Sequence, residues 1–138
     1  MPLWTLHHTA GSLSEPDRAE LAGRITDLYS FLPRFYVSVV FHEAPAGSLY
    51  VGGEAAKDFV RIAVEHIARK LPTEQARTGW LTRAHAAVTP FMTERNLGWE
   101  LHVDETPMEL WSIQGLRPPP PDSDAERRWA QENRPTPY

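Results

Sequence analysis

The stretch FYVSVVF, Phe35–Phe41, is dense in aromatic and β-branched residues and predicts the strongest strand of the chain. Upstream of it, Ser14 followed by Glu-Pro-Asp is typical of a helix start, with a capping hydroxyl and an early proline. Apolar residues then recur at helical spacing, so a helix is predicted from about Glu15 to Phe31. The moderately alternating segment Leu3–His8 predicts a short strand close to the N-terminus. Residues near 2–42 therefore form one predicted β-α-β unit.

The same plan repeats downstream at a period of roughly 60 residues. The linker Glu43–Gly53 holds three glycines and a proline, which predicts a turn, a small ribbon strand and a second turn. Phe59–Ile67 is predicted as a strand, Thr73 begins a predicted helix, and Trp99–Val103 is predicted as the last strand. A second β-α-β unit is therefore expected near 59–103.

Two tandem β-α-β units predict an α/β fold, of the α+β kind, with one four-stranded sheet and two helices on one face. The other face is expected to carry Trp and β-branched side chains that need cover, which a homotrimer would supply. A single domain is expected over residues 1–117. The Pro-rich, charged segment 118–138 is expected either to be disordered or to lie across a neighbouring subunit, because it cannot bury enough apolar surface to fold alone.

The composition excludes several classes of protein. The 138 residues contain no cysteine, which excludes disulfides, thiolate nucleophiles and cysteine-based metal sites. A net charge of −4 disfavours a nucleic-acid binder, and no apolar run approaches the roughly 18 residues that span a membrane. The first residues do not form a secretory signal, so a cytoplasmic protein is expected. The common nucleotide-binding, zincin and serine-hydrolase motifs are missing, and no cofactor is expected.

One hypothetical metal site can be assembled from the histidines of the sequence. Two of them, near predicted strand ends, could combine with a glutamate into a two-His-one-carboxylate site. No ligand spacing supports this site, so no metal is expected. The histidines concerned are His7, His42, His66 and His102, and the glutamates are Glu43 and Glu65.

Pro2 is the most informative single residue. It is small enough that removal of Met1 is expected, which leaves a secondary amine on a rigid ring at the start of a strand. An α-amino group has a reference pKa of about 8, and burial beside apolar groups or cations lowers it further. Such an amine is suited to act as a general base, although a proline at this position is also compatible with a terminus that has no role.

Several stretches, taken in order, carry a resemblance to a known family. They are Pro2 at the start of the first strand, ITD at 25–27, FHEAPAGSLYVGG at 41–53, EHIAR at 65–69 and DETP at 104–107. With these features the chain resembles the tautomerase superfamily, whose members use an amino-terminal proline on a repeated β-α-β fold. It is most similar to the cis-3-chloroacrylic acid dehalogenase group. The resemblance covers residues 2 to about 117 and implies a homotrimer, with three two-unit subunits in a barrel-like ring of sheets.

The resemblance implies roles for individual residues. Pro2 is the implied catalytic base or acid, and Arg69 takes the second position of the family's Arg-x-x-Arg carboxylate clamp. The first position of that clamp is His66, which is expected to bind a carboxylate only when protonated, with a pKa near 6.5 or higher. Tyr29 replaces a histidine of the first helix, and His102 replaces a tyrosine of the last strand.

The water-activating glutamate of the dehalogenases falls at Ile113 or Gln114, neither of which can accept a proton. Keto–enol tautomerisation does not need this group, because one base moves a proton and hydrogen-bond donors hold the enolate. We therefore expect a Pro-dependent tautomerase that acts on a small keto/enol carboxylate. Two alternatives stay open. One is a dehalogenase or hydratase in which Glu109 or His102 replaces the glutamate, and the other is a catalytically silent binding or assembly protein.

Overall fold

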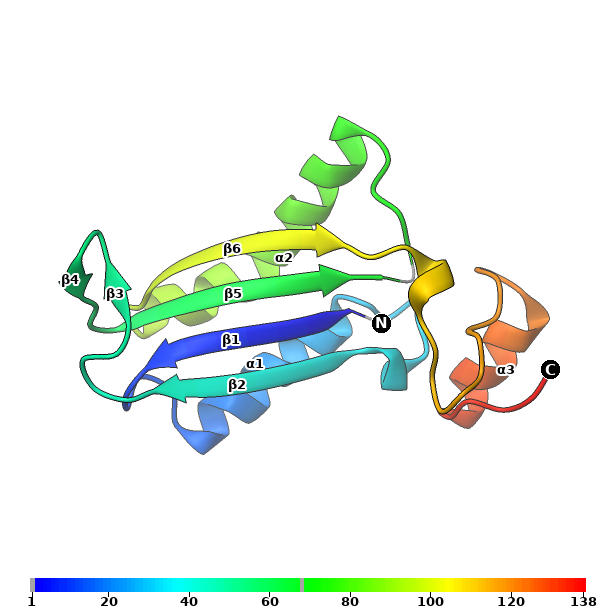
Figure 1. Cartoon of the computed structure of the whole chain (residues 1–138), viewed down its shortest axis with the longest axis horizontal. Coiled ribbons are helices and arrows are strands. Elements are labelled where there is room, and N and C mark those ends of the chain that lie inside the picture. Colours follow the sequence, from blue (N-terminus) through cyan, green and yellow to red (C-terminus); the bar gives the residue numbers. More distant parts are fainter. Residues whose placement is uncertain (1, 68) are drawn as a thin grey trace.

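The computed structural model describes residues 2–67 and 69–138. A four-stranded sheet in the order β2-β1-β5-β6 is covered on one face by α1 and α2, which lie behind it in Figure 1. Over the described ranges, no helix is long and apolar enough to cross a membrane. The bounds are β1 Leu3–Thr9, α1 Glu15–Asp27, η1 Arg34–Tyr36, β2 Ser38–Ala44, β3 Tyr50–Val51, β4 Glu54–Ala55, β5 Phe59–His66, α2 Glu74–Glu94, β6 Gly98–Glu105, η2 Met108–Leu110 and α3 Asp124–Glu132.

The sheet is mixed, and its pairing follows the two repeats. β1 pairs with β2 in parallel and β5 pairs with β6 in parallel, as expected for two β-α-β units. The two units join through an antiparallel pair, β1 with β5, in which Leu3 lies opposite Glu65. The short ribbon of β3 and β4 projects from the connection between the units (Figure 1). The predicted fold class is confirmed.

The segment between α1 and β2 departs from the prediction. The helix ends at Asp27, not Phe31, because the chain tightens into i→i+3 turns, such as the bond from the Tyr29 N–H to the Thr26 carbonyl at 3.1 Å. The strand begins at Ser38, not Phe35, because Arg34–Tyr36 forms a short 3₁₀ helix. Tyr36 is fully buried there, so its apolar ring belongs to the core without being part of a strand.

The helix-covered face of the sheet carries the core. Trp4 and Leu6 are fully buried on this face, and Trp99 packs its ring against His85 of α2 at 5.5 Å. The expectation that the uncovered face carries Trp side chains is therefore wrong, because strand alternation directs these rings to the helices. The uncovered face, called the open face below, is mostly polar. Its residues include Thr5, His7, Val40, His42, Arg61, Ala63, Glu100 and His102.

The C-terminal segment folds onto its own chain. It forms α3, in which the Trp129 ring is fully buried and lies 5.9 Å from the Phe35 ring and 6.3 Å from the Tyr36 ring. The side-chain oxygen of Asn133 accepts a hydrogen bond from the Phe35 N–H at 3.2 Å. The expectation of a disordered tail is wrong, because Trp129 packs against the turn 34–36, which the prediction had assigned to a strand.

Candidate active site

Pro2 lies at the start of β1 and is buried. Its carbonyl accepts a hydrogen bond from the Ser38 N–H at 3.0 Å, which ties the first residues to β2. Because Leu3 lies opposite Glu65, the residues next to them, Pro2 and His66, lie at the same end of the sheet. Strands β5 and β6 also finish at this end, where the N-terminus is marked in Figure 1.

An aromatic cluster of Trp4, Tyr29, His66 and Trp80 lies on the helix-covered side of this sheet end. The Trp4 Nε1–H donates to the Tyr29 hydroxyl at 3.1 Å, and the Trp4 and Trp80 rings are 6.0 Å apart. The His66 ring lies 5.4 Å from Trp80 and 6.1 Å from Tyr29. All four side chains are nearly or fully buried, so the cluster forms an apolar, water-poor wall.

Burial keeps both titratable members of the aromatic cluster uncharged. It raises the pKa of Tyr29 to about 12, so the phenol retains its proton at physiological pH. Burial also lowers the pKa of His66 below its ordinary 6.5, and Glu105 opposes this only in part. The Arg69 backbone also interacts with the His66 ring in the direction that raises the pKa, but burial is the larger effect. We expected a pKa near 6.5 or higher for His66, and burial shifts it in the opposite direction.

Arg69 is held by the C-terminal segment. Its Nη1 and Nη2 atoms donate to the two carboxylate oxygens of Glu126 at 3.3 and 3.0 Å, and Asp122 lies 3.6 Å away. Glu126 also accepts a hydrogen bond from the Asp122 N–H at 2.7 Å and is only 5% exposed. Arg69 and His66 thus have different surroundings, since one contacts carboxylates and the other contacts aromatic rings.

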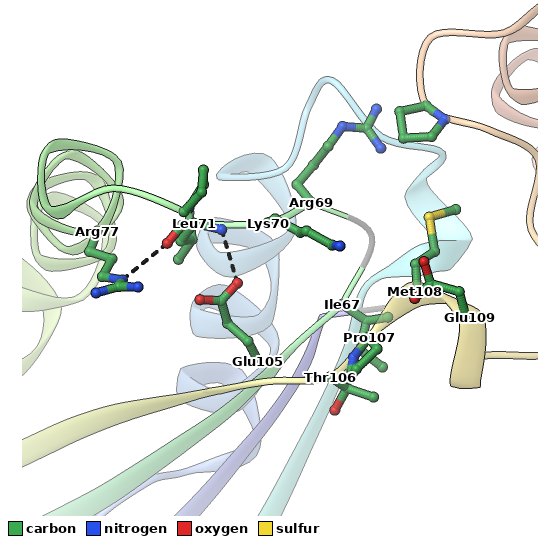
Figure 2. A pocket seen from close by; sticks show the side chains of 12 residues that line it. Ile67, Arg69, Lys70, Leu71, Arg77, Glu105, Thr106, Pro107, Met108 and Glu109 are labelled. Atoms are coloured by element: carbon green, nitrogen blue, oxygen red, sulfur yellow. Dashed lines mark hydrogen bonds between the residues drawn. The ribbon is translucent and has the colours of Figure 1, made fainter.

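A pocket of about 570 Å³ opens beside Arg69 (Figure 2). The Lys70 ammonium extends into this space, while Glu105 accepts a hydrogen bond from the Leu71 N–H at 2.9 Å and Arg77 donates to the Leu71 carbonyl at 3.0 Å. The pocket combines cations with an apolar floor, a pattern suited to a small organic anion. Its lining is Ile67, Arg69, Lys70, Leu71, Pro72, Arg77, Glu105, Thr106, Pro107, Met108, Glu109 and Pro121.

Two predicted residues, His102 and Gln114, do not line the pocket beside Arg69. His102 is on the open face, where its Nδ1 is 2.9 Å from Arg61 Nη2 and its Nε2 is 3.4 Å from Asp104. Gln114 is exposed in a tight turn closed by reciprocal backbone bonds between Ile113 and Leu116, and its φ is 51°. At the edge of the sheet, His102 lines a smaller cavity of about 300 Å³ together with Trp80 of the aromatic cluster. The catalytic roles predicted for His102 and Gln114 therefore stay predictions.

Sequence reasoning missed Glu126 and Lys70. A signal for Glu126 exists, because Ser123 followed three residues later by Glu126 is typical of a helix capping box. The Ser123 hydroxyl does accept the Glu126 N–H at 3.2 Å, but the Glu126 carboxylate binds Arg69 in place of the Ser123 backbone. Over residues 2–67 and 69–138, no group of three or more metal-ligating side chains comes together.

Comparison with known proteins supports the family resemblance. The family model described as "Putative oxalocrotonate tautomerase enzyme" matches residues 1–134. No curated protein matches the chain. A crystal structure of native RhCC from Rhodococcus jostii RHA1 is 46% identical, covers 99% of both chains and has a TM-score of 0.93. A probable enzyme from Aspergillus fumigatus is 39% identical, covers 100% of this chain and 98% of its own, and has a TM-score of 0.95.

More distant structures share the fold. N1, a member of the cis-3-chloroacrylic acid dehalogenase family, is 24% identical over 95% of this chain and 97% of its own, with a TM-score of 0.76. A fused tautomerase described as a symmetric trimer is 18% identical over 83% and 94% of the two chains, with a TM-score of 0.66. With the family match over nearly the whole length, the chain belongs to the oxalocrotonate tautomerase family within the tautomerase superfamily.

Proposed function

We propose that this protein catalyses keto–enol tautomerisation of a small carboxylate-bearing ketone, with Pro2 as the general base after removal of Met1. The observation that supports this most is the buried position of Pro2 at the sheet end where the aromatic cluster and the 570 Å³ pocket also lie. A buried amine near uncharged rings loses solvation of its charged form. Its pKa then falls below the reference of about 8, which makes it a base near neutral pH.

In the proposed reaction, the Pro2 nitrogen takes a proton from the carbon next to the substrate carbonyl. The electrons of that C–H bond form the C=C bond of the enol, and the carbonyl oxygen gains the negative charge. Tyr29 retains its proton and is our proposed donor to that oxygen. Proton return from the proline ammonium to carbon or oxygen then completes the exchange, so no cofactor is required.

Arg69 is the proposed anchor of the substrate carboxylate, since it lines the pocket with a planar guanidinium suited to this group. His66 is proposed to act as a neutral ring that borders the site, because burial disfavours its charged form. This mechanism does not need His102, which faces the open side of the sheet, or Gln114, which lies in an exposed turn.

We propose a homotrimer as the assembly. A fused tautomerase with the same fold is a symmetric trimer, which supports an oligomer here. In a trimer, the polar open face would be covered by hydrogen-bonded contacts, not by an apolar seam. Light scattering should give three times the chain mass of 15.7 kDa, and a monomer at micromolar concentration would contradict the assembly.

Intact mass and phenylpyruvate enolisation test the function together. The mass should lack Met1, and enolisation should depend on one group that titrates below about 8, with the rate rising as this group loses its proton. Pro2→Ala should lose most of the turnover while keeping the near-UV circular dichroism of the wild type. Retention of Met1 would favour a catalytically silent protein, whereas full turnover in Pro2→Ala would remove Pro2 from the mechanism.

A second reaction is supported by one residue. Glu109 lines the pocket on η2, and its carboxylate could activate a water molecule for hydration or dehalogenation of a 3-substituted acrylate. Halide release from cis-3-chloroacrylate that Glu109→Gln abolishes would establish this activity. Absence of halide release in the wild type would leave tautomerisation alone.

A further inference from the structure

We propose that Glu126 is a positioning residue for Arg69, so that α3 is part of the substrate-binding site. This inference rests on the proposed function, because it concerns the residue assigned to the substrate carboxylate. The C-terminal segment already forms part of the pocket wall through Pro121. It also carries the carboxylate that contacts Arg69 most closely.

The contacts of the Glu126 carboxylate with Arg69 are close and buried. Its two oxygens receive the Arg69 Nη1 and Nη2 donors at 3.3 and 3.0 Å, and one of them receives the Asp122 N–H at 2.7 Å. The Glu126 side chain is 6% exposed, whereas that of Arg69 is 23% exposed. A carboxylate buried this deeply depends on its cation, because an unpaired buried charge is strongly disfavoured.

The pairing geometry determines where the guanidinium lies. Arg69 belongs to the connection between β5 and α2, and an arginine there has many rotamers that a point contact would not select. A two-pronged pair fixes both the position and the plane of a guanidinium. Glu126 therefore presents Arg69 to the pocket in one orientation before any substrate arrives, which reduces the entropy lost on binding.

The position of Glu126 is set by contacts that do not involve the pocket. The Ser123 hydroxyl accepts a hydrogen bond from the Glu126 N–H, and three residues further along the helix the buried Trp129 packs against Tyr36. Asn133 then binds the Phe35 backbone at the end of α3. Because Ser123, Trp129 and Asn133 do not line the pocket, these anchors hold the helix and its carboxylate in place whether or not the pocket is occupied.

The opposite possibility is that Glu126 competes with the substrate for Arg69. The two possibilities predict opposite changes in Glu126→Gln, which keeps the size of the side chain and removes its charge. A positioning residue should raise the KM for phenylpyruvate by roughly tenfold and change kcat by less than about twofold. A competing residue should lower the KM.

Phenylacetaldehyde provides the matched substrate, because it also enolises but has no carboxylate. Its KM should be unchanged in Glu126→Gln, whereas a general loss of structure would affect both compounds. Glu132→Gln is the matched control on the same helix, since this exposed glutamate pairs with Arg134 at 3.3 Å and does not line the pocket. In an Arg69→Ala background, Glu126→Gln should add no further increase in KM.

Glu126→Asp keeps the charge on a shorter chain and should raise the KM by less than Glu126→Gln does. If Glu126→Gln does not fold, by near-UV circular dichroism, the carboxylate-selective change in Glu126→Asp decides the matter. A KM for phenylpyruvate that is unchanged or lower, or an equal increase for both substrates, would overturn the proposal.

A binding experiment separates this proposal from the proposed function. Tryptophan fluorescence should report binding of 3-phenylpropionate, an unreactive carboxylate, to the wild type even if no tautomerase activity is found. Glu126→Gln and Arg69→Ala should weaken that binding by similar factors. No binding to the wild type, or equal binding to the wild type and Glu126→Gln, would overturn the role of Glu126 independently of the role of Pro2.

Discussion

His66 and Glu126 are buried to almost the same degree, 3% and 5% exposed, but their surroundings differ completely. His66 lies among aromatic rings, so burial lowers its pKa and leaves it neutral. Glu126 lies against a guanidinium and a backbone N–H, which compensate its charge. Burial alone therefore does not decide whether a side chain at this sheet end is charged. The nearest partner decides it, and the candidate site has one uncharged wall and one ion-paired wall.

Removal of the cation from the ion-paired wall should have the largest effect. Arg69→Met leaves Glu126 buried beside an apolar chain, and we expect a loss of about 3 kcal/mol in the free energy of unfolding. Urea denaturation measures it. Arg134→Met, which removes a pair between exposed residues, should cost less than about 1 kcal/mol. Equal losses in the two variants would show that the burial of Glu126 has no energetic consequence.

Removal of a polar atom from the uncharged wall should have a smaller effect. Tyr29→Phe leaves the Trp4 Nε1–H buried without its acceptor, and we expect a loss of about 1–3 kcal/mol by urea denaturation. Tyr138→Phe removes an exposed hydroxyl that donates to the Arg117 carbonyl, and it should change stability by less than about 0.5 kcal/mol. A Tyr29→Phe variant as stable as Tyr138→Phe would mean that water reaches the aromatic cluster.

A pH titration tests the neutral state of His66. Its pKa is lower in the folded than in the unfolded chain, so the unfolded state binds more protons below the ordinary 6.5. The stability is therefore intact above that pH and falls as the pH drops below it, by at most about 1.4 kcal/mol per pH unit from this group. His66→Phe should lose this part of the pH dependence, measured by thermal unfolding between pH 7 and 5. The exposed His85→Gln should retain it.

The open face should be the least sensitive region. Arg61 and Glu100 form an ion pair at 3.0 Å with side chains 36% and 58% exposed, so Glu100→Gln should cost no more than about 1 kcal/mol and less at high salt. Denaturation at two salt concentrations measures this. A loss well above that size, dependent on protein concentration, would show that another copy of the chain covers this face.

The elements with a strong repeating pattern were predictable. The strands near β1, β5 and β6 and the helices α1 and α2 appear where alternation and helical spacing place them. The structure of segment 28–37 was not predictable in this way. The residues of FYVSVVF all favour a strand, but Tyr36 packs in the core against Trp111 and Trp129. Such contacts join residues more than seventy positions apart, and local propensity does not contain them.

Some features of the candidate site could be predicted from the sequence, and others could not. The position of Pro2 at the start of a strand follows from the strand pattern that comes directly after it. The family follows from the repeats and the motifs. The charge state of His66 and the partner of Arg69 do not, since they depend on which rings and carboxylates the folded chain brings within a few ångströms.

The sequence by itself determined the two β-α-β units, the family and the proline at the start of the first strand, because periodicity, capping and motif spacing are local properties. Only the tertiary structure decided that Trp4 and Trp99 face the helices, that His66 lies among aromatic rings and that Glu126 of α3 holds Arg69. The physical reason is that burial and charge compensation are set by neighbours in space, and here those neighbours come from separate elements of the chain.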